Sequence, residues 1–192
     1  MKNKSHNMTK KDSVNENKEK QTNPYPSATT FLNVIRDEYT KEIERSNSLD
    51  NKAGIFIAAI IAVLTIFVPN IPYKNIVGSL YADRNVAIIT VFLCLLTGAL
   101  ILIVISFTEL YMVIKTEGYK RPQIDSLIKE NLLQQDENVS QEGLIEHYYE
   151  IVDSNENLNS KKAKHLDTGI IIAVIAFLLM LIVTIVLNFI TA

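Results

Sequence analysis

The 192-residue sequence contains no tryptophan, a single cysteine, five prolines and six glycines. The lone Cys94 excludes a disulfide framework or a cysteine metal cluster within one chain. The three histidines, His6, His147 and His165, are far apart, and no HExxH, glycine-rich phosphate loop or nucleophile-elbow motif is present. We therefore expect no enzyme, no cofactor and no metal site.

The sequence also lacks a large excess of either charge, since the formal net charge is -2. A chain without a basic field is not expected to bind nucleic acid. Residues 1–26 are rich in Lys, Asn, Ser, Thr and Glu and have almost no apolar residue. Such a segment buries too little surface to offset its ordering entropy, so we predict a disordered polar tail.

The sequence does contain three long apolar stretches, of which the central one is the clearest. Val86 to Phe107 holds no charge and no proline. As a helix it would rise about 33 Å, close to the roughly 30 Å hydrocarbon core of a bilayer. It lacks the polar stripe that a core helix of a soluble domain shows. We predict a transmembrane helix over about 86–108.

Two further spans are predicted at about 53–69 and 168–190. The first is short, but Lys52 can snorkel at one end while Ile71 and Tyr73 sit in the interface at the other. The third is dominated by Ile, Leu, Val and Phe, whose summed insertion free energy is favourable by roughly 5 to 9 kcal/mol. Both stretches are therefore expected to cross the bilayer.

The predicted fold is all-α: an integral membrane protein with three transmembrane helices, the first and third extended into the cytoplasm. After the tail, residues 27–192 form one helical membrane domain, with a cytoplasmic helical loop over 115–167. Of the 19 Lys and Arg residues, only Lys74 and Arg84 lie between the first and second spans. The positive-inside rule then places the N-terminus and the 115–167 loop in the cytoplasm and the C-terminus outside the plasma membrane.

The first extension is predicted to begin after Ser27 as N-cap and to carry one apolar stripe. Neither proline nor glycine interrupts it before Gly54, although Ser46-Asn47-Ser48 is a point where it could bend. The second extension is predicted to begin at a Ser140 cap and to run through Gly169 into the third span.

Between these extensions, the central helix is expected to stop near Gly118. Pro122 is then expected at the first turn of a short amphipathic helix. The apolar residues of that helix would be Ile124, Leu127, Ile128 and Leu132.

The segments before the first and third spans share a pattern of small polar residues, lysine and alanine. The first motif comprises Asp50, Lys52, Ala53 and Gly54, and the second comprises Asn155, Asn159, Lys162 and Ala163. We expect the two to pack side by side as a polar collar, with Lys52 and Lys162 near lipid phosphates. The alternative is that lysines occur at any membrane boundary without a special role.

Thr97, Thr108 and Glu109 lie on one side of a helix wheel in and just after the central span. They could line a pore, with Glu109 as a charged ring at its mouth in an oligomer. The alternative is that each hydroxyl bonds back to its own helix and that Glu109 is an interfacial acid. A pore from one copy would have too thin a wall, so several copies would be needed.

The two pre-span motifs, Asp50-x-Lys52-Ala53-Gly54 and Asn155…Asn159-x-x-Lys162-Ala163, resemble those of Pycsar transmembrane effectors and the related SMODS- and SLOG-associating (SLATT-type) domains. The resemblance covers about residues 32–190. It implies a toxic antiphage effector of the bacterial inner membrane. The effector would oligomerise in lipid and perforate or depolarise the membrane when a nucleotide-signalling partner releases it. The alternatives are a membrane-anchored adaptor for a cytosolic partner and a structural membrane protein without toxicity.

Overall fold

The computed structural model describes residues 26–71, 78, 86–115, 118–123 and 134–191. Within them the ordered elements are α1 (Ala28–Phe67), the short 3-10 helix η1 (Val68–Asn70), α3 (Val86–Ile114) and α5 (Glu137–Thr191). The described residues contain no strand. The predicted all-α fold is therefore confirmed.

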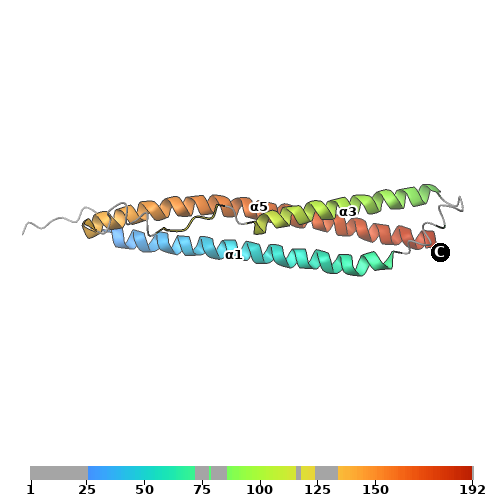
Figure 1. The fold of residues 1–192 in the computed structure, drawn as a ribbon, viewed down its shortest axis with the longest axis horizontal. Helices are drawn as coiled ribbons and strands as arrows, with labels where there is room; N and C mark the ends of the chain where they lie inside the picture. Colours follow the sequence, from blue (N-terminus) through green and yellow to red (C-terminus); the bar gives the residue numbers. More distant parts are fainter. Residues whose placement is uncertain (1–25, 72–77, 79–85, 116–117, 124–133, 192) are drawn as a thin grey trace, which may run out of the picture.

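The three long helices form an extended bundle (Figure 1). α5 has 55 residues and runs the length of the bundle, about 80 Å at 1.5 Å per residue. α1 lies beside α5 and runs in the same direction. α3 covers only the half of the bundle that contains the C-terminal ends of α1 and α5. The chain thus builds a three-helix half and a half made mainly of α1 and α5.

Each long helix contains one of the predicted spans. α1, α3 and α5 are long and apolar enough to cross a membrane. α1 runs through Ser46-Asn47-Ser48 without interruption, and Ser46 is buried there, so the bend considered for this point does not occur. α1 ends at Phe67, two residues before Pro69 of η1, because proline has no N–H to continue the α-helical hydrogen bonds.

Of the two predicted helix starts, that of α1 agrees with the structure and that of α5 does not. Ser27 occupies the N-cap position of α1, although its side chain makes no capping hydrogen bond. The Ser140 cap was wrong: α5 begins three residues earlier at Glu137, and the Ser140 N–H already donates to Asp136 O at 3.0 Å. An acidic residue in the first turn suits the positive end of the helix dipole, which favours the earlier start.

The chain leaves α3 by a turn at Gly118. Its φ of 86° is a left-handed conformation that favours glycine. α3 itself ends at Ile114, close to the predicted stop. Pro122 is not helical, and the rest of the predicted amphipathic helix (124–132) lies outside the described residues, as does nearly all of the predicted tail.

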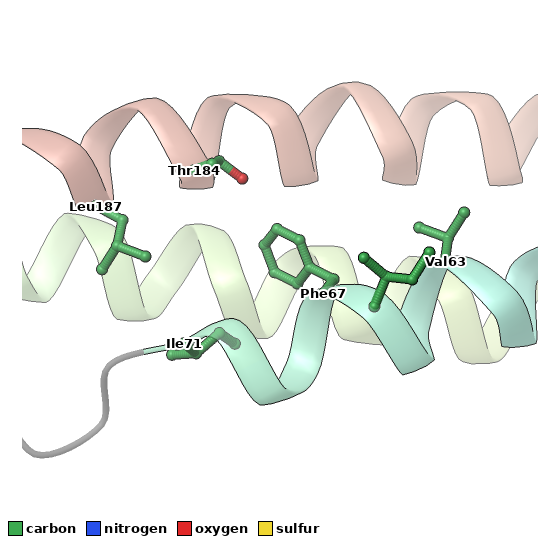
Figure 2. Close-up of a pocket in the computed structure, with 6 residues that line it drawn as sticks. Val63, Phe67, Ile71, Thr184 and Leu187 are labelled. Carbon is green, nitrogen blue, oxygen red and sulfur yellow. The ribbon is translucent and has the colours of Figure 1, made fainter.

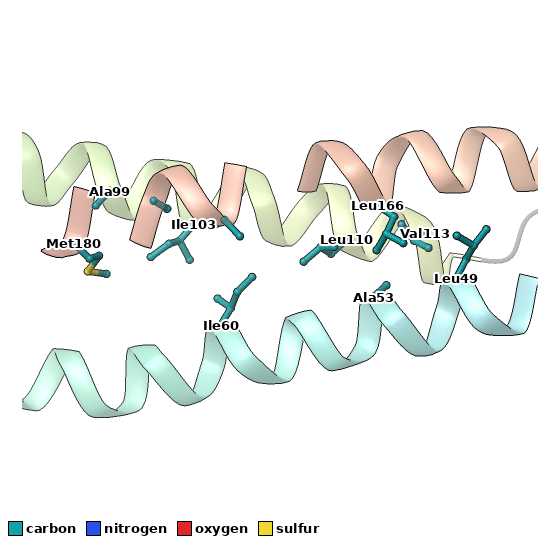
Figure 3. Close-up of a cluster of buried hydrophobic side chains, with 11 residues drawn as sticks. Leu49, Ala53, Ile60, Ala99, Ile103, Leu110, Val113, Leu166 and Met180 are labelled. Atoms are coloured by element: carbon teal, nitrogen blue, oxygen red, sulfur yellow. The ribbon is translucent and has the colours of Figure 1, made fainter. Parts of the chain in front are cut away.

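The core of the three-helix half is apolar and closed (Figure 3). Leu49, Ala53 and Ile60 of α1 face side chains of α3 and α5 such as Leu110 and Met180. Several core residues are small, which lets helix backbones approach closely, as is usual inside membranes. They are Ala53, Ala99, Ala173 and Ala176.

The outward faces of the same helices expose large aliphatic side chains, among them Ile55, Ile101 and Leu178. A soluble domain would bury such surfaces. Their number and position suit a surface that meets lipid, in agreement with three candidate membrane spans.

Candidate functional site

The pre-span segments of α1 and α5 meet through a buried lysine. Lys162 is only 3% exposed, and its Nζ donates to Asp50 Oδ1 at 2.9 Å and to Asp50 Oδ2 at 3.2 Å. The same ammonium donates to Ser46 Oγ at 3.0 Å. A buried ammonium is tolerated only with a counter-charge and satisfied donors, and α1 supplies both. The contact therefore ties α5 to α1 next to the first span.

One turn earlier on α5, Asn159 makes a second contact with α1. It is fully buried, and its Nδ2 donates to Glu42 O at 2.8 Å and to Glu42 Oε2 at 2.7 Å. Its Oδ1 is buried without a hydrogen-bond partner among the described residues. The amide thus fixes the register of α5 against α1 while one acceptor stays unsatisfied.

Asn155, one turn earlier again, holds the chain that follows α3. Lys120 N–H donates to Asn155 Oδ1 at 3.0 Å, and Asn155 Nδ2 donates to Lys120 O at 3.0 Å. The amide therefore pairs with both backbone groups of one residue. It fastens the segment Gly118–Gln123 along α5.

Tyr119 lies inside this fastened segment. Its hydroxyl is buried and has no hydrogen-bond partner in the described part of the chain. Burial, followed by the nearby Tyr39 and Glu42, raises the pKa of Tyr119 to about 12. The segment is therefore packed onto the helices even though one polar group goes unsatisfied beneath it.

Asn155, Asn159 and Lys162 are spaced by four and three residues, so they lie on one face of α5. We call these three residues, with Ser46, Asp50 and Glu42 of α1 and the Lys120 backbone, the polar ladder. Nearer the far end of the same helix pair, Tyr39 and Tyr148 make an edge-to-face contact with ring centroids 5.7 Å apart. α1 and α5 are thus joined along their extensions.

The remaining residues of the two motifs have different positions. Ala53 is fully buried in the core, Lys52 is exposed, and Gly54 has open space beside it. The prediction that Lys162 lies near lipid phosphates was wrong. The acidic Asp50 on the neighbouring helix pairs with Lys162 in the interior, whereas Lys52 has no acidic partner among the described residues and is exposed.

The three pore candidates do not share one surface. Thr97 and Thr108 are exposed on the outside of α3, and Thr108 Oγ1 donates to Ile105 O of its own helix at 2.7 Å. Glu109 turns toward α5, where its Oε2 lies 2.7 Å from His165 Nδ1. The carboxylate is thus paired inside one copy and does not extend the threonine surface.

Ser106 carries a contact that the sequence left open. It is fully buried, and its Oγ donates to Gly169 O of α5 at 2.8 Å. Thr65 and Thr184 instead donate to carbonyls of their own helices, Ile61 O and Met180 O. Nothing in the local sequence distinguishes the crossing hydroxyl from the others. The one sequence signal for this contact is Gly169 on α5, because a glycine there lets α3 and α5 approach closely.

An apolar groove of about 360 Å³ lies between α1 and α5 near the end of the first span. Figure 2 shows Val63 and Phe67 of α1, with Ile71 directly after η1, facing Thr184 and Leu187 of α5. None of the lining side chains that the structure describes is ionisable. The groove therefore offers surface for hydrocarbon and no group for acid–base or metal chemistry.

No group of three His, Cys, Asp or Glu side chains that could hold a metal ion occurs in the described ranges. The polar groups of this site instead make contacts between helices.

Comparison with known proteins finds no family model, no curated relative and no solved structure that matches this chain.

Proposed function

We propose that the chain is a membrane effector that assembles from several copies and permeabilises the bacterial inner membrane in antiphage defence. Its state would be controlled through the cytoplasmic parts of α1 and α5. The N-terminus and the 115–167 loop would face the cytoplasm, where lysine and arginine accumulate. A nucleotide-signalling partner would act on that side, as the family resemblance implies.

The observation that carries this proposal is the burial of Lys162. A lysine beside a membrane span is expensive unless it is paired, and its partner Asp50 lies on a different helix. If α1 moved away from α5, an unpaired charge would be left behind. The pair therefore favours one packed arrangement of α1 and α5. A ligand or partner whose binding compensated for the loss of the Lys162–Asp50 interaction could stabilise another arrangement.

The helices provide a physical connection from the cytoplasm to the membrane. α1 and α5 each run without a break from the extension into the span. A displacement of the cytoplasmic helix pair is therefore transmitted to the spans as a rigid-body movement.

The closed core explains why several copies are needed. Ile60, Ile103 and Met180 fill the space between the spans, so one copy offers no polar path along its axis. Ions would have to cross between copies. The exposed Thr97 and Thr108 are then available to such a path, whereas Glu109 would contribute only after leaving His165.

The test is controlled expression in bacteria with a potential-sensitive dye, with and without phage infection. We expect depolarisation before growth stops. An unrelated three-span protein expressed to the same membrane level controls for overloading. Retained membrane potential under both conditions, with the chain present in the membrane, would refute the proposal.

An adaptor role is favoured by a different observation. Phe31 and Tyr149 lie outside the predicted spans and are 61% and 62% exposed, which suits a surface for a cytosolic partner. An adaptor predicts normal growth and a co-purified soluble protein that Phe31→Ser and Tyr149→Ser variants lose. Normal growth without such a protein would favour a structural role.

A further inference from the structure

The segment that follows α3 runs along the extension of α5. Gly118 turns the chain with a φ of 86°, and Asn155 bonds both backbone groups of Lys120. Asn155 lies about 20 Å along α5 from the start of the predicted third span at 168, at 1.5 Å per residue. We call the segment Gly118–Gln123 the strap. It holds the chain next to the end of α3 against a part of α5 that is well outside the span.

The strap is loosely packed. A hollow of about 680 Å³ lies beside it against α5, and Tyr119, Arg121 and His147 are among its lining residues. A second hollow of about 530 Å³ borders Gly118 and Lys120. The exposed side chains of Lys120 and Arg121 form no ion pair with the described residues. Few packed contacts and high exposure are features of segments that open locally.

Buried polar atoms without a partner gather at the strap. In the described part of the chain they are the Tyr119 hydroxyl, His147 Nε2 and Asn159 Oδ1. Tyr119 belongs to the strap, His147 lines the same hollow, and Asn159 lies one turn from Asn155. A buried polar group without a partner costs free energy that hydration returns. Docking of the strap therefore carries a penalty at Tyr119 that its release removes.

The Tyr119 hydroxyl finds no unoccupied acidic acceptor beside it. Burial, followed by Tyr39 and Glu42, raises the pKa of Tyr119 to about 12, which places Glu42 nearby. Glu42 Oε2 already accepts from Asn159 Nδ2 at 2.7 Å, and its Oε1 lies 3.5 Å from Arg45 Nη1. Both carboxylate oxygens therefore have partners. On docking, the phenol loses its hydrogen bonds to water and gains none in return.

We propose that the strap is a two-state segment, docked on α5 by Asn155 and released when water satisfies Tyr119, and that this exchange controls the end of α3. Asn155 favours docking because it satisfies both backbone groups of Lys120. Tyr119 favours release because its hydroxyl is then hydrated. Gly118 provides the hinge, since glycine adopts positive and negative φ at little cost. These opposing contributions keep both states populated.

Release would detach the chain that follows α3 from the extension of α5. Leu110 and Val113, near the end of α3, belong to the buried core, so the helix itself would stay packed. What changes is the connection between α3 and the part of α5 outside the span. This control rests on the proposed function, in which the docked strap belongs to the silent state and the released strap to the active one.

The test is hydrogen–deuterium exchange of the full chain in lipid nanodiscs, read by mass spectrometry that resolves the Lys120 amide. Tyr119→Phe keeps the ring and removes the unsatisfied hydroxyl, so exchange of Lys120 N–H should slow about fivefold or more. Tyr111→Phe is the matched control, because Tyr111 is 55% exposed on α3 and should leave the rate unchanged. An unchanged or faster rate in Tyr119→Phe would overturn the proposal.

Asn155→Asp tests the opposing contribution. The carboxylate can still accept from Lys120 N–H, but it cannot donate to Lys120 O, and it places a charge at a fully buried position. Exchange at Lys120 should therefore accelerate about tenfold, although the acceptor of the measured amide remains. Adding Tyr119→Phe to Asn155→Asp should bring the rate back toward that of the parent chain. A rate that Asn155→Asp leaves unchanged would also overturn the proposal.

The dye measurement separates the strap from the function. Asn155→Asp should depolarise cells at a lower expression level than the parent chain, and Tyr119→Phe should require a higher one. Depolarisation by the parent chain at a level that neither variant shifts would overturn the control by the strap and leave the effector function intact. The expected changes in exchange with retained membrane potential would support the two states of the strap and refute the effector function.

Discussion

At the residue scale, the ion pair of Lys162 predicts an asymmetry between its two partners. Asp50→Asn leaves an ammonium that is 3% exposed without a counter-charge, and should cost about 3 kcal/mol of unfolding free energy. Lys162→Met removes the ammonium and leaves Asp50, whose side chain is 30% exposed and can be hydrated. It should cost clearly less.

Thermal unfolding in detergent, followed by circular dichroism, measures both variants. Lys161→Met is the matched control, because the neighbouring Lys161 is exposed and should tolerate the change within about 0.5 kcal/mol. If Lys162→Met destabilised the protein more than Asp50→Asn, the burial of an unpaired Lys162 ammonium would not be the dominant cost.

Two glycines predict opposite effects of the same substitution. A Cβ on Gly169 would lie 2.9 Å from Leu110 Cγ and 3.3 Å from Glu109 Cβ, where α3 and α5 touch. Gly169→Ala should therefore destabilise by about 1 to 3 kcal/mol. A Cβ on Gly98 would meet Leu179 at an ordinary 3.7 Å, so Gly98→Ala should be neutral or stabilising.

The same unfolding assay compares the two alanine variants. Because both changes add one methyl group to a helix, the difference between them reports the close approach at Gly169. Equal stabilities would contradict that packing.

Tyr119 predicts a loss of stability in alkali. Burial raises the pKa of Tyr119 to about 12 from the ordinary value of 10.0, so the folded state keeps the neutral phenol to a higher pH than the unfolded state does. The stabilisation is complete below pH 10 and is lost as pH rises through about 12. Tyr119→Phe should lose less stability over that range.

Tyr119→Phe also removes a buried hydroxyl that has no partner among the described residues. At neutral pH the variant should therefore be at least as stable as the parent chain. Denaturation curves at neutral and alkaline pH check both expectations, and a marked destabilisation at neutral pH would show that the hydroxyl has a partner.

At the scale of elements, Asn155 controls whether Gly118–Gln123 stays on α5. Asn155→Ala removes both hydrogen bonds to the Lys120 backbone, at about 1 kcal/mol each, so the segment should detach more often. Trypsin cleavage after Lys120 should accelerate about tenfold or more, as expected if local opening governs the rate.

Asn157→Ala is the control for that experiment. Asn157 is exposed and its Nδ2 donates to Asp153 O within α5, so its loss releases no other element. Matching cleavage rates for the two variants would show that the amide of Asn155 does not hold the segment.

The elements themselves were largely predictable from local sequence. The lack of proline and glycine before Gly54 predicted a long first helix, and the run through Gly169 predicted a continuous last one, as α1 and α5 show. Ser140 was misleading as a cap because serine also occurs inside a first turn, and the acidic Glu137 before it begins the helix.

At the scale of the whole molecule, orientation is the property to test. In a Cys94→Ser background, a membrane-impermeant maleimide should label Ser79→Cys in intact cells. Ser140→Cys should react only after the cells are opened, because the positive-inside rule predicts that the lysine-rich side faces the cytoplasm. The reverse pattern would invert the topology, and a chain that stays soluble and monomeric without detergent would refute membrane insertion.

The sequence by itself determined that there are three long apolar helices, because length, hydrophobicity and lack of charge are local properties that a bilayer or a core must satisfy. Only the tertiary structure decided that Lys162 turns inward to Asp50, that Ser106 bonds across to Gly169, and that Glu109 separates from Thr97 and Thr108. Each of these contacts joins residues far apart in the chain. Their formation depends on how the helices are rotated and shifted against one another, which the spacing within one helix does not specify.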